Sequence, residues 1–123
     1  MTTLWQNFEM YVKQLLLKEF PDYDIISQQT LTSGLRPDYV LESVEQTGIV
    51  DAKEKLRLDK SDIEKMADYM YELGNGIAGA VVWGKIYVSS YTKITKKILA
   101  RASGYKIEIK KTDWDVSKYY SNN

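Results

Sequence analysis

Cysteine and histidine are both absent from this chain of 123 residues. Without cysteine there can be no disulfide, no thiolate metal site and no cysteine nucleophile, and this composition fits a reducing cytoplasm. Without histidine, the chain cannot use Ser-His-Asp hydrolysis, histidine-zinc sites or a histidine general base. Any hydrolytic chemistry of this chain would therefore have to use carboxylates and lysines.

A secretion signal and a long apolar run are also missing. The first residues are polar and amphipathic, and no apolar run approaches the roughly 20 residues that a membrane helix needs. We therefore expect a soluble, cytoplasmic protein with no membrane partner. The length is ordinary for one globular core, so we expect a single domain over 1–112 followed by a polar tail over 113–123.

Charge is balanced overall but unevenly distributed along the chain. The 17 basic and 17 acidic residues sum to zero, yet residues 1–84 carry 8 basic and 14 acidic side chains, whereas residues 85–123 carry 9 and 3. The two parts therefore have net charges of −6 and +6. This division favours a polyanion on the basic part and a divalent cation on the acidic part, although such asymmetry also arises by chance.

The first half of the chain predicts a helix followed by three strands. Apolar residues between 3 and 19 recur at helical spacing, and Pro21 stops the helix. Residues 24–31, 37–42 and 49–56 have the composition of strands, and Thr47-Gly48 is typical of a turn into the third.

The second half predicts two further helices and more strands. A capping box of Ser61 and Glu64 opens a helix over 61–73 that Gly74 ends, and a second helix covers about 92–103. Strands are predicted over 77–83, over 85–90 after a turn at Gly84, and over 105–111. The order αβββαβ(β)αβ predicts the α/β class, with a mixed central β-sheet flanked by helices.

Three charged residues lie where a sheet interior is expected. Asp38 opens one predicted strand, while Asp51 and Lys53 lie two residues apart on the next, on one face and roughly 7 Å apart. Because buried charges are costly, something must compensate them. A Mg²⁺ ion held by the two carboxylates would do so, with Mn²⁺ as a substitute, and Lys53 beside it would complete a site for phosphodiester hydrolysis.

The string Pro37-Asp38, twelve residues, then Asp51-Ala52-Lys53 resembles the signature of the PD-(D/E)XK, restriction-endonuclease-like nucleases. The resemblance covers roughly residues 5–90 and implies a restriction-endonuclease-like core of αβββαβ order. It also implies a third carboxylate from the first helix, for which Glu9 is the matching position and Glu19 the alternative. On the helix after the lysine, Lys65 and Tyr69 occupy positions comparable to those where the family places a polar residue and an aromatic one, but this chain departs from the family by having lysine where glutamine is common.

These observations favour a Mg²⁺-dependent endodeoxyribonuclease in which Glu9, Asp38 and Asp51 hold the metal and Lys53 assists the attacking water. DNA is the expected partner, without a small-molecule cofactor, and a homodimer would let two sites address two strands. The DNA-phosphate contacts predicted from their helical spacing are Lys93, Lys96, Lys97 and Arg101.

Several alternatives stay open. The chain resembles archaeal-type Holliday junction resolvases in size and in its SGLRPD string, but restriction, homing, phage and toxin nucleases share the core, and RNA is a possible substrate. A noncatalytic nucleic-acid-binding or assembly subunit is the runner-up function. The charged strand could also be a protected sheet edge, and the lysine run a solvated helix face.

Overall fold

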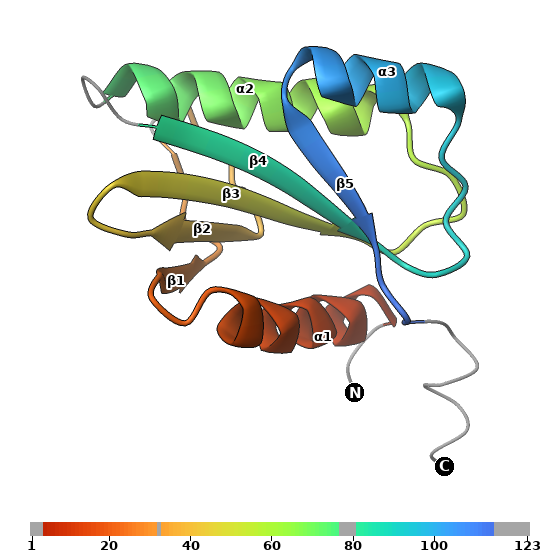
Figure 1. Ribbon diagram of the computed structural model, residues 1–123, viewed down its shortest axis with the longest axis horizontal. Coiled ribbons are helices and arrows are strands. Elements are labelled where there is room, and N and C mark those ends of the chain that lie inside the picture. The colour runs from red at the N-terminus through yellow and green to blue at the C-terminus, as the bar shows by residue number, and fades with distance from the viewer. Residues whose placement is uncertain (1–3, 32, 77–80, 115–123) are drawn as a thin grey trace.

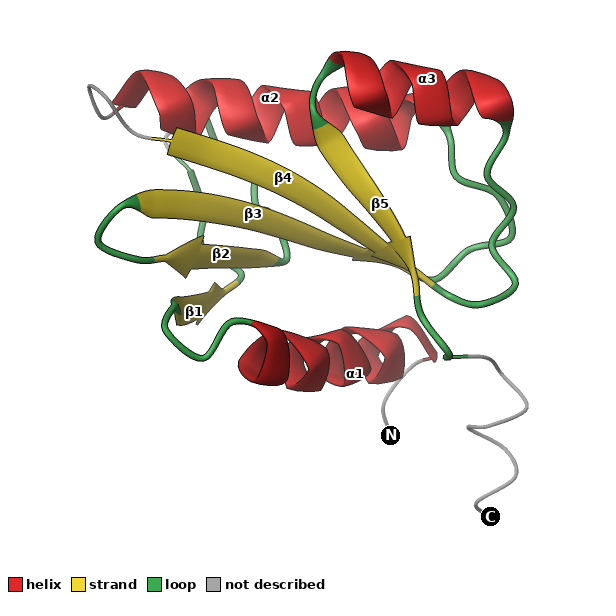
Figure 2. Ribbon diagram, viewed as in Figure 1, coloured by secondary structure: helices red, strands yellow, loops and turns green. Residues whose placement is uncertain are grey.

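The computed structural model describes residues 4–31, 33–76 and 81–114, which form one five-stranded sheet with three helices. The elements are α1 (Leu4–Glu19), β1 (Asp24–Ser27), β2 (Tyr39–Glu42), β3 (Gln46–Lys53), α2 (Lys60–Gly76), β4 (Val81–Val88), α3 (Lys96–Gly104) and β5 (Ile107–Lys111). Figure 2 shows the strands as one twisted sheet between helical layers.

The sheet is mixed and follows chain order, β1-β2-β3-β4-β5. The first three strands are antiparallel neighbours, whereas β4 runs parallel to both β3 and β5. Helix α1 covers one face, and α2 and α3 cover the other (Figure 1). The predicted α/β class, with a mixed sheet flanked by helices, is therefore confirmed, and the described residues contain a separate apolar core on each face.

Helix α1 packs on the sheet through one apolar stripe. Phe8, Val12 and Leu16 follow one another at four-residue spacing, and all three have no exposed surface. Burying each such side chain contributes about 1.5–3 kcal/mol. The helix ends at Glu19, just before Pro21, as predicted.

The turn between β2 and β3 is not where the sequence predicted it. Ser43 donates its backbone N–H to the carbonyl of Gln46 (2.9 Å), so the reversal lies at 43–46, and Gly48 lies within β3. A Cβ atom at Gly48 would be 2.1 Å from Cζ2 of Trp83 on the adjacent strand. The glycine thus makes room for an aromatic ring and does not form a turn.

Gly84 was also wrongly predicted as a turn. It lies in the middle of β4, a single strand from Val81 to Val88, and the predicted strand residues 77–80 lie outside the described residues. A Cβ atom at Gly84 would be 2.5 Å from Sδ of Met70. Close packing of α2 on the sheet explains this second glycine.

The boundaries of several other elements differ from the prediction. The third strand, predicted over 49–56, spans Gln46–Lys53, and the last, predicted from 105, begins at Ile107. The run predicted over 24–31 ends at Ser27, where Gln28 takes a φ of 54°. Helix α2 begins at Lys60 and continues through Gly74; its first turn is capped by Asp62, which accepts the backbone N–H of Asp59 (2.8 Å). Helix α3 begins after its N-cap Thr95, so the predicted helical start at 92 is wrong.

The predicted C-terminal tail is partly packed on the fold. Trp114, assigned by the sequence to the polar tail, packs its ring 5.3 Å from that of Tyr11 on α1. Residues 115–123 of that predicted tail lie outside the described residues. Among the helices that the structure describes, none is long and apolar enough to cross a membrane.

Candidate active site

Asp38 and Asp51 lie side by side where β2 begins next to the end of β3, at the opposite end of the strand pair from the turn at 43–46. The backbone N–H of Asp38 donates to Oδ1 of Asp51 (3.1 Å), and the backbone N–H of Ala52 donates to Oδ2 of Asp38 (2.8 Å). Pro37, which has no N–H and a fixed φ, is buried immediately before Asp38. The two carboxylates predicted from the sequence are therefore brought together across adjacent strands.

Lys53 lies on the same face of β3 as Asp51. Ile49 of the same strand belongs to the core beneath α2, and alternation along a strand places residues 51 and 53 on that side as well. The ammonium of Lys53 is close enough to oppose the rise in the pKa of Asp51. Lys53 is half-buried, as expected at the end of an interior strand.

Glu9 reaches this pair from α1. The hydroxyl of Tyr39 donates to the carbonyl of Glu9 (2.8 Å), which fastens the helix beside the start of β2. Burial, followed by a hydrogen bond to Asp38 and repulsion from both aspartates, raises the pKa of Glu9 to about 8. The structure thus gathers Glu9, Asp38, Asp51 and Lys53 in one place.

Glu19, the alternative acid on the first helix, is engaged elsewhere. It accepts hydrogen bonds from the Tyr87 hydroxyl (2.6 Å) and from Lys110 Nζ (2.9 Å), and Lys85 Nζ lies 3.7 Å away. Burial raises the pKa of Glu19, but the Tyr87 and Lys110 hydrogen bonds outweigh it, so the net pKa lies below its usual value. Glu19 therefore compensates the largely buried Lys85.

The electrostatics of Asp51 suit a bound cation. The residue is 2% exposed, and burial together with repulsion from Asp38 raises its pKa to about 6. Its Oδ2 atom is buried and accepts no hydrogen bond from any described residue. An unsatisfied carboxylate oxygen beside a second carboxylate is a donor set that Mg²⁺ prefers.

The carboxylates do not by themselves form a closed cage. No group of three or more acidic side chains within 4–31, 33–76 and 81–114 is arranged to hold a metal ion. A site built from two carboxylates still fits Mg²⁺, because that ion usually keeps several waters and binds substrate phosphate.

Two residues of α2 complete the surroundings of Asp51. Lys65 is exposed, and its positive charge opposes the rise in the pKa of Asp51. Tyr69 is 1% exposed, and burial, followed by the charges of Asp51 and Asp38, raises its pKa above the usual value. Both positions that the sequence suggested on this helix thus lie beside the aspartates.

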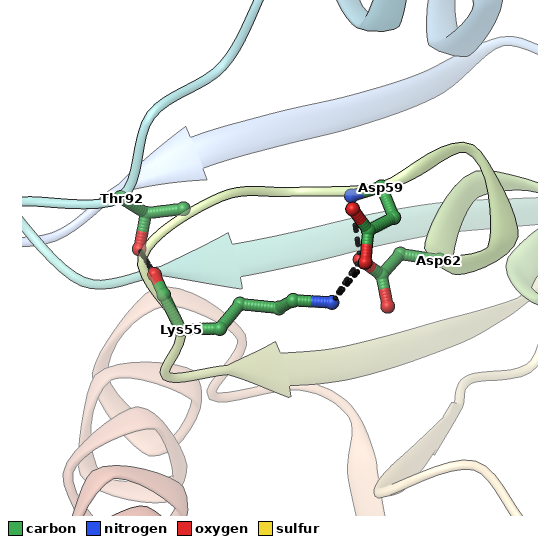
Figure 3. A network of polar contacts seen from close by, with 4 residues as sticks. All are labelled: Lys55, Asp59, Asp62 and Thr92. Atoms are coloured by element: carbon green, nitrogen blue, oxygen red, sulfur yellow. Dashed lines mark hydrogen bonds and ion pairs between the residues drawn. The ribbon is translucent and has the colours of Figure 1, made fainter.

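The segment that follows Lys53 is fastened by a network that the sequence did not reveal (Figure 3). Lys55 Nζ binds Asp59 and Asp62, both at 2.9 Å. Burial lowers the pKa of Lys55, but these two carboxylates raise it more, and the net pKa is above its usual value. The strand carrying Lys53 is thereby anchored to the first turn of α2.

A buried pair of hydroxyls anchors the same segment to the chain after β4. Thr92 Oγ1 donates to the carbonyl of Lys55 (2.7 Å) and lies 2.6 Å from Ser89 Oγ, and neither hydroxyl residue is exposed. Sequence reasoning missed this contact, because neither residue carries a local signal and the two partner segments are 37 residues apart.

The predicted phosphate-binding residues lie just before α3 and along it, with Arg101 in its last turn. Lys96, Lys97 and Arg101 are exposed on the helix, and Arg101 lies 3.4 Å from Glu64. Lys93 lies before the helix, in a loop whose backbone pairs with that of Leu56. Three of the four predicted cations therefore lie on α3, whereas Lys93, predicted on the same helix, precedes it.

No family model and no curated protein matches the sequence. The fold is similar to that of a repair endonuclease from Pyrococcus abyssi (TM-score 0.64, 17% identity, 85% of this chain and 46% of that one). It is also similar to EndoMS in a complex with double-stranded DNA (0.67, 13%, 91% and 46%) and to SfsA of Pyrococcus furiosus in complex with Ca²⁺ (0.54, 18%, 86% and 54%). The chain spans about half the length of these proteins, and at such identities the likeness concerns the fold.

Proposed function

We propose that this protein is a metal-dependent endonuclease of the PD-(D/E)XK kind that hydrolyses DNA phosphodiester bonds. The observation that carries the proposal is the arrangement of Asp38 and Asp51, each accepting a backbone N–H from the other's segment, with Lys53 on the same face of β3 as Asp51. In this arrangement Oδ2 of Asp51 is buried and accepts no hydrogen bond from a described residue. The fold shared with repair endonucleases supports the proposal, and so does the absence of histidine, which this chemistry does not need.

In this proposal the carboxylates bind the metal, and the lysines act on the water and the phosphate. Asp38 and Asp51 would hold the cation, with Glu9 as a further acid. A bound Mg²⁺ or Mn²⁺ would polarise the phosphate and lower the pKa of water. Lys53 would keep the attacking water in place and stabilise negative charge on the phosphoryl oxygens, and Lys65 would add positive charge on the side of α2.

DNA is the proposed substrate, and a homodimer is the proposed working state. A structural neighbour is an EndoMS complex with double-stranded DNA, and α3 and the loop before it carry four exposed cations, Lys93, Lys96, Lys97 and Arg101. Two copies would present two sites to the two strands of a symmetric or branched DNA, as in a Holliday junction.

A noncatalytic nucleic-acid-binding role is the alternative, and one observation favours it. The described part of the chain holds no group of three acids arranged around a metal. Metal binding separates the two functions, because a noncatalytic subunit has no need of the cation.

The proposal is tested by measuring both metal binding and cleavage. Calorimetric titration with Mn²⁺ should show binding to the native protein and its loss in Asp38→Ala. Incubation with supercoiled plasmid and a labelled four-way junction should show cleavage with Mg²⁺ or Mn²⁺, none with EDTA and none by Asp38→Ala. Asp68→Ala, which removes an exposed carboxylate of α2, is the matched control and should retain both properties. Undiminished cleavage by Asp38→Ala would refute the assignment.

A further inference from the structure

A groove of about 750 Å³ lies between the start of α2 and the first turns of α3. Leu58 and Ile98 lie beneath it, but they are only 1% and 9% exposed, so the surface open to a ligand is chiefly that of the charged side chains. Four cationic side chains line it, namely Arg57, Lys60, Lys97 and Arg101. Two of these, Arg57 and Lys60, had no role in the sequence-based prediction.

The charges around this groove are left largely available to a ligand. Its single lining carboxylate, Asp59, is already bound by Lys55 at 2.9 Å. Lys60 and Arg101 share one carboxylate, that of Glu64, at 3.6 and 3.4 Å. Among the described residues, neither Arg57 nor Lys97 forms an ion pair, although the charge of Arg57 helps to lower the pKa of Asp59.

The ion pairs that do exist at the groove are easily exchanged. The side chains of Lys60, Glu64 and Arg101 are between 39% and 61% exposed. Exposed pairs of this kind contribute little to stability, so a multivalent anion can displace them readily. The groove thus fits a ligand with several negative charges in a row.

The groove is tied to the candidate active site by the backbone. Arg57 follows Lys53 by four residues, so their Cα atoms are at most about 14 Å apart. The intervening loop is held in place because Lys93 N–H donates to Leu56 O (2.8 Å) and Leu58 N–H donates to Lys93 O (3.1 Å). The groove therefore lies a short distance along the chain from Lys53, and these hydrogen bonds fix its position relative to β3.

We propose that this groove holds the sugar-phosphate backbone of one nucleic-acid strand, a few nucleotides from the phosphate that the active site addresses. The four cations contact successive phosphates of this strand. Arg57 and Lys60 are the diagnostic residues, because they belong to the groove and not to the active site. The inference rests on the proposed function for its choice of ligand but not on catalysis.

The test is the salt dependence of binding to a labelled single-stranded oligonucleotide in EDTA, where cleavage does not interfere. The double variant Arg57→Gln/Lys60→Gln removes two groove cations. The control Lys18→Gln/Lys106→Gln removes two exposed lysines that lie outside the groove. Thermal unfolding of all three proteins verifies that each variant is folded.

Each lost phosphate contact should reduce the slope of log K against log salt by about 0.7 for a single strand. The groove variant should therefore lose about 1.4 from the slope, while the control keeps the native slope. Equal slopes for the two double variants would overturn the proposal. Groove-dependent binding without cleavage would uphold it and count against the nuclease, whereas cleavage with equal slopes would do the reverse.

Discussion

Replacing Asp51 by asparagine should stabilise the metal-free protein while abolishing its activity. The side chains are almost equal in size, and the Oδ1 atom that accepts the backbone N–H of Asp38 is retained. The change removes the negative charge of a side chain that is 2% exposed and lies beside the carboxylate of Asp38. Stability and function should therefore move in opposite directions at this residue.

The magnitude follows from the pKa of Asp51. Burial and repulsion from Asp38 raise it from 3.8 to about 6. At about 1.4 kcal/mol per pKa unit, ionisation of this carboxylate costs the folded state about 3 kcal/mol, and no discount for solvent screening applies at this degree of burial. Lys53 loses a partner in the variant, so the net gain should be about 1–3 kcal/mol, or about 4–12 °C in Tm.

The gain should depend on pH in a defined direction. Because the pKa in the folded state lies above that of the unfolded chain, native Asp51 carries no penalty when it is protonated in both states, below about pH 4. The penalty grows as the pH rises from about 4 to about 6 and is complete above that range. The advantage of Asp51→Asn should therefore be absent at pH 3.5 and full at pH 7.5.

Chemical denaturation in EDTA across this pH range is the assay. Repeating it with Mg²⁺ adds a second reading, because a cation that binds only the folded state raises its stability. The native protein should gain stability with Mg²⁺ and Asp51→Asn should not. An asparagine variant that is less stable than the native protein at every pH would refute the reasoning.

Two further substitutions test the packing and the network behind the site. Gly48→Ala should cost about 1–3 kcal/mol, because its Cβ would meet the ring of Trp83 at 2.1 Å, whereas Gly104→Ala, with open space around it, should not destabilise the fold in thermal melts. Thr92→Val should cost about 1–3 kcal/mol in urea denaturation, because it leaves the carbonyl of Lys55 without its donor, and Thr92→Ser should restore most of the loss.

The sequence predicted the elements and their order because their signals are local. The apolar stripe of α1, the interior run of β3 and the alternation in β5 each follow from periodicity alone. The two wrong turns, at Gly48 and Gly84, share one physical reason. Each glycine admits a side chain from another element, Trp83 or Met70, and such a contact leaves no trace in the neighbouring residues.

The sequence predicted the charged residues at the centre of the candidate site, but not the hydrogen bonds that hold the surrounding segments in place. Asp38, Asp51 and Lys53 stood out because charge is rare in an interior strand. The hydrogen bond from Tyr87 to Glu19 joins residues that are 68 positions apart in the sequence. The hydrogen bond from Thr92 to the carbonyl of Lys55 joins residues that are 37 positions apart. Such pairings become visible only when the topology of the sheet is known. The catalytic and metal-binding roles stay predictions that experiments must test.

The most direct test of the central claim is plasmid cleavage by the native protein and by Lys53→Ala, compared in Mg²⁺ and in EDTA. Lys106→Ala, an exposed lysine outside the site, serves as the control for loss of charge. The proposed chemistry predicts Mg²⁺-dependent nicking by the native protein and by the control, and none by Lys53→Ala. Equal nicking by all three proteins, or nicking that persists in EDTA, would contradict it.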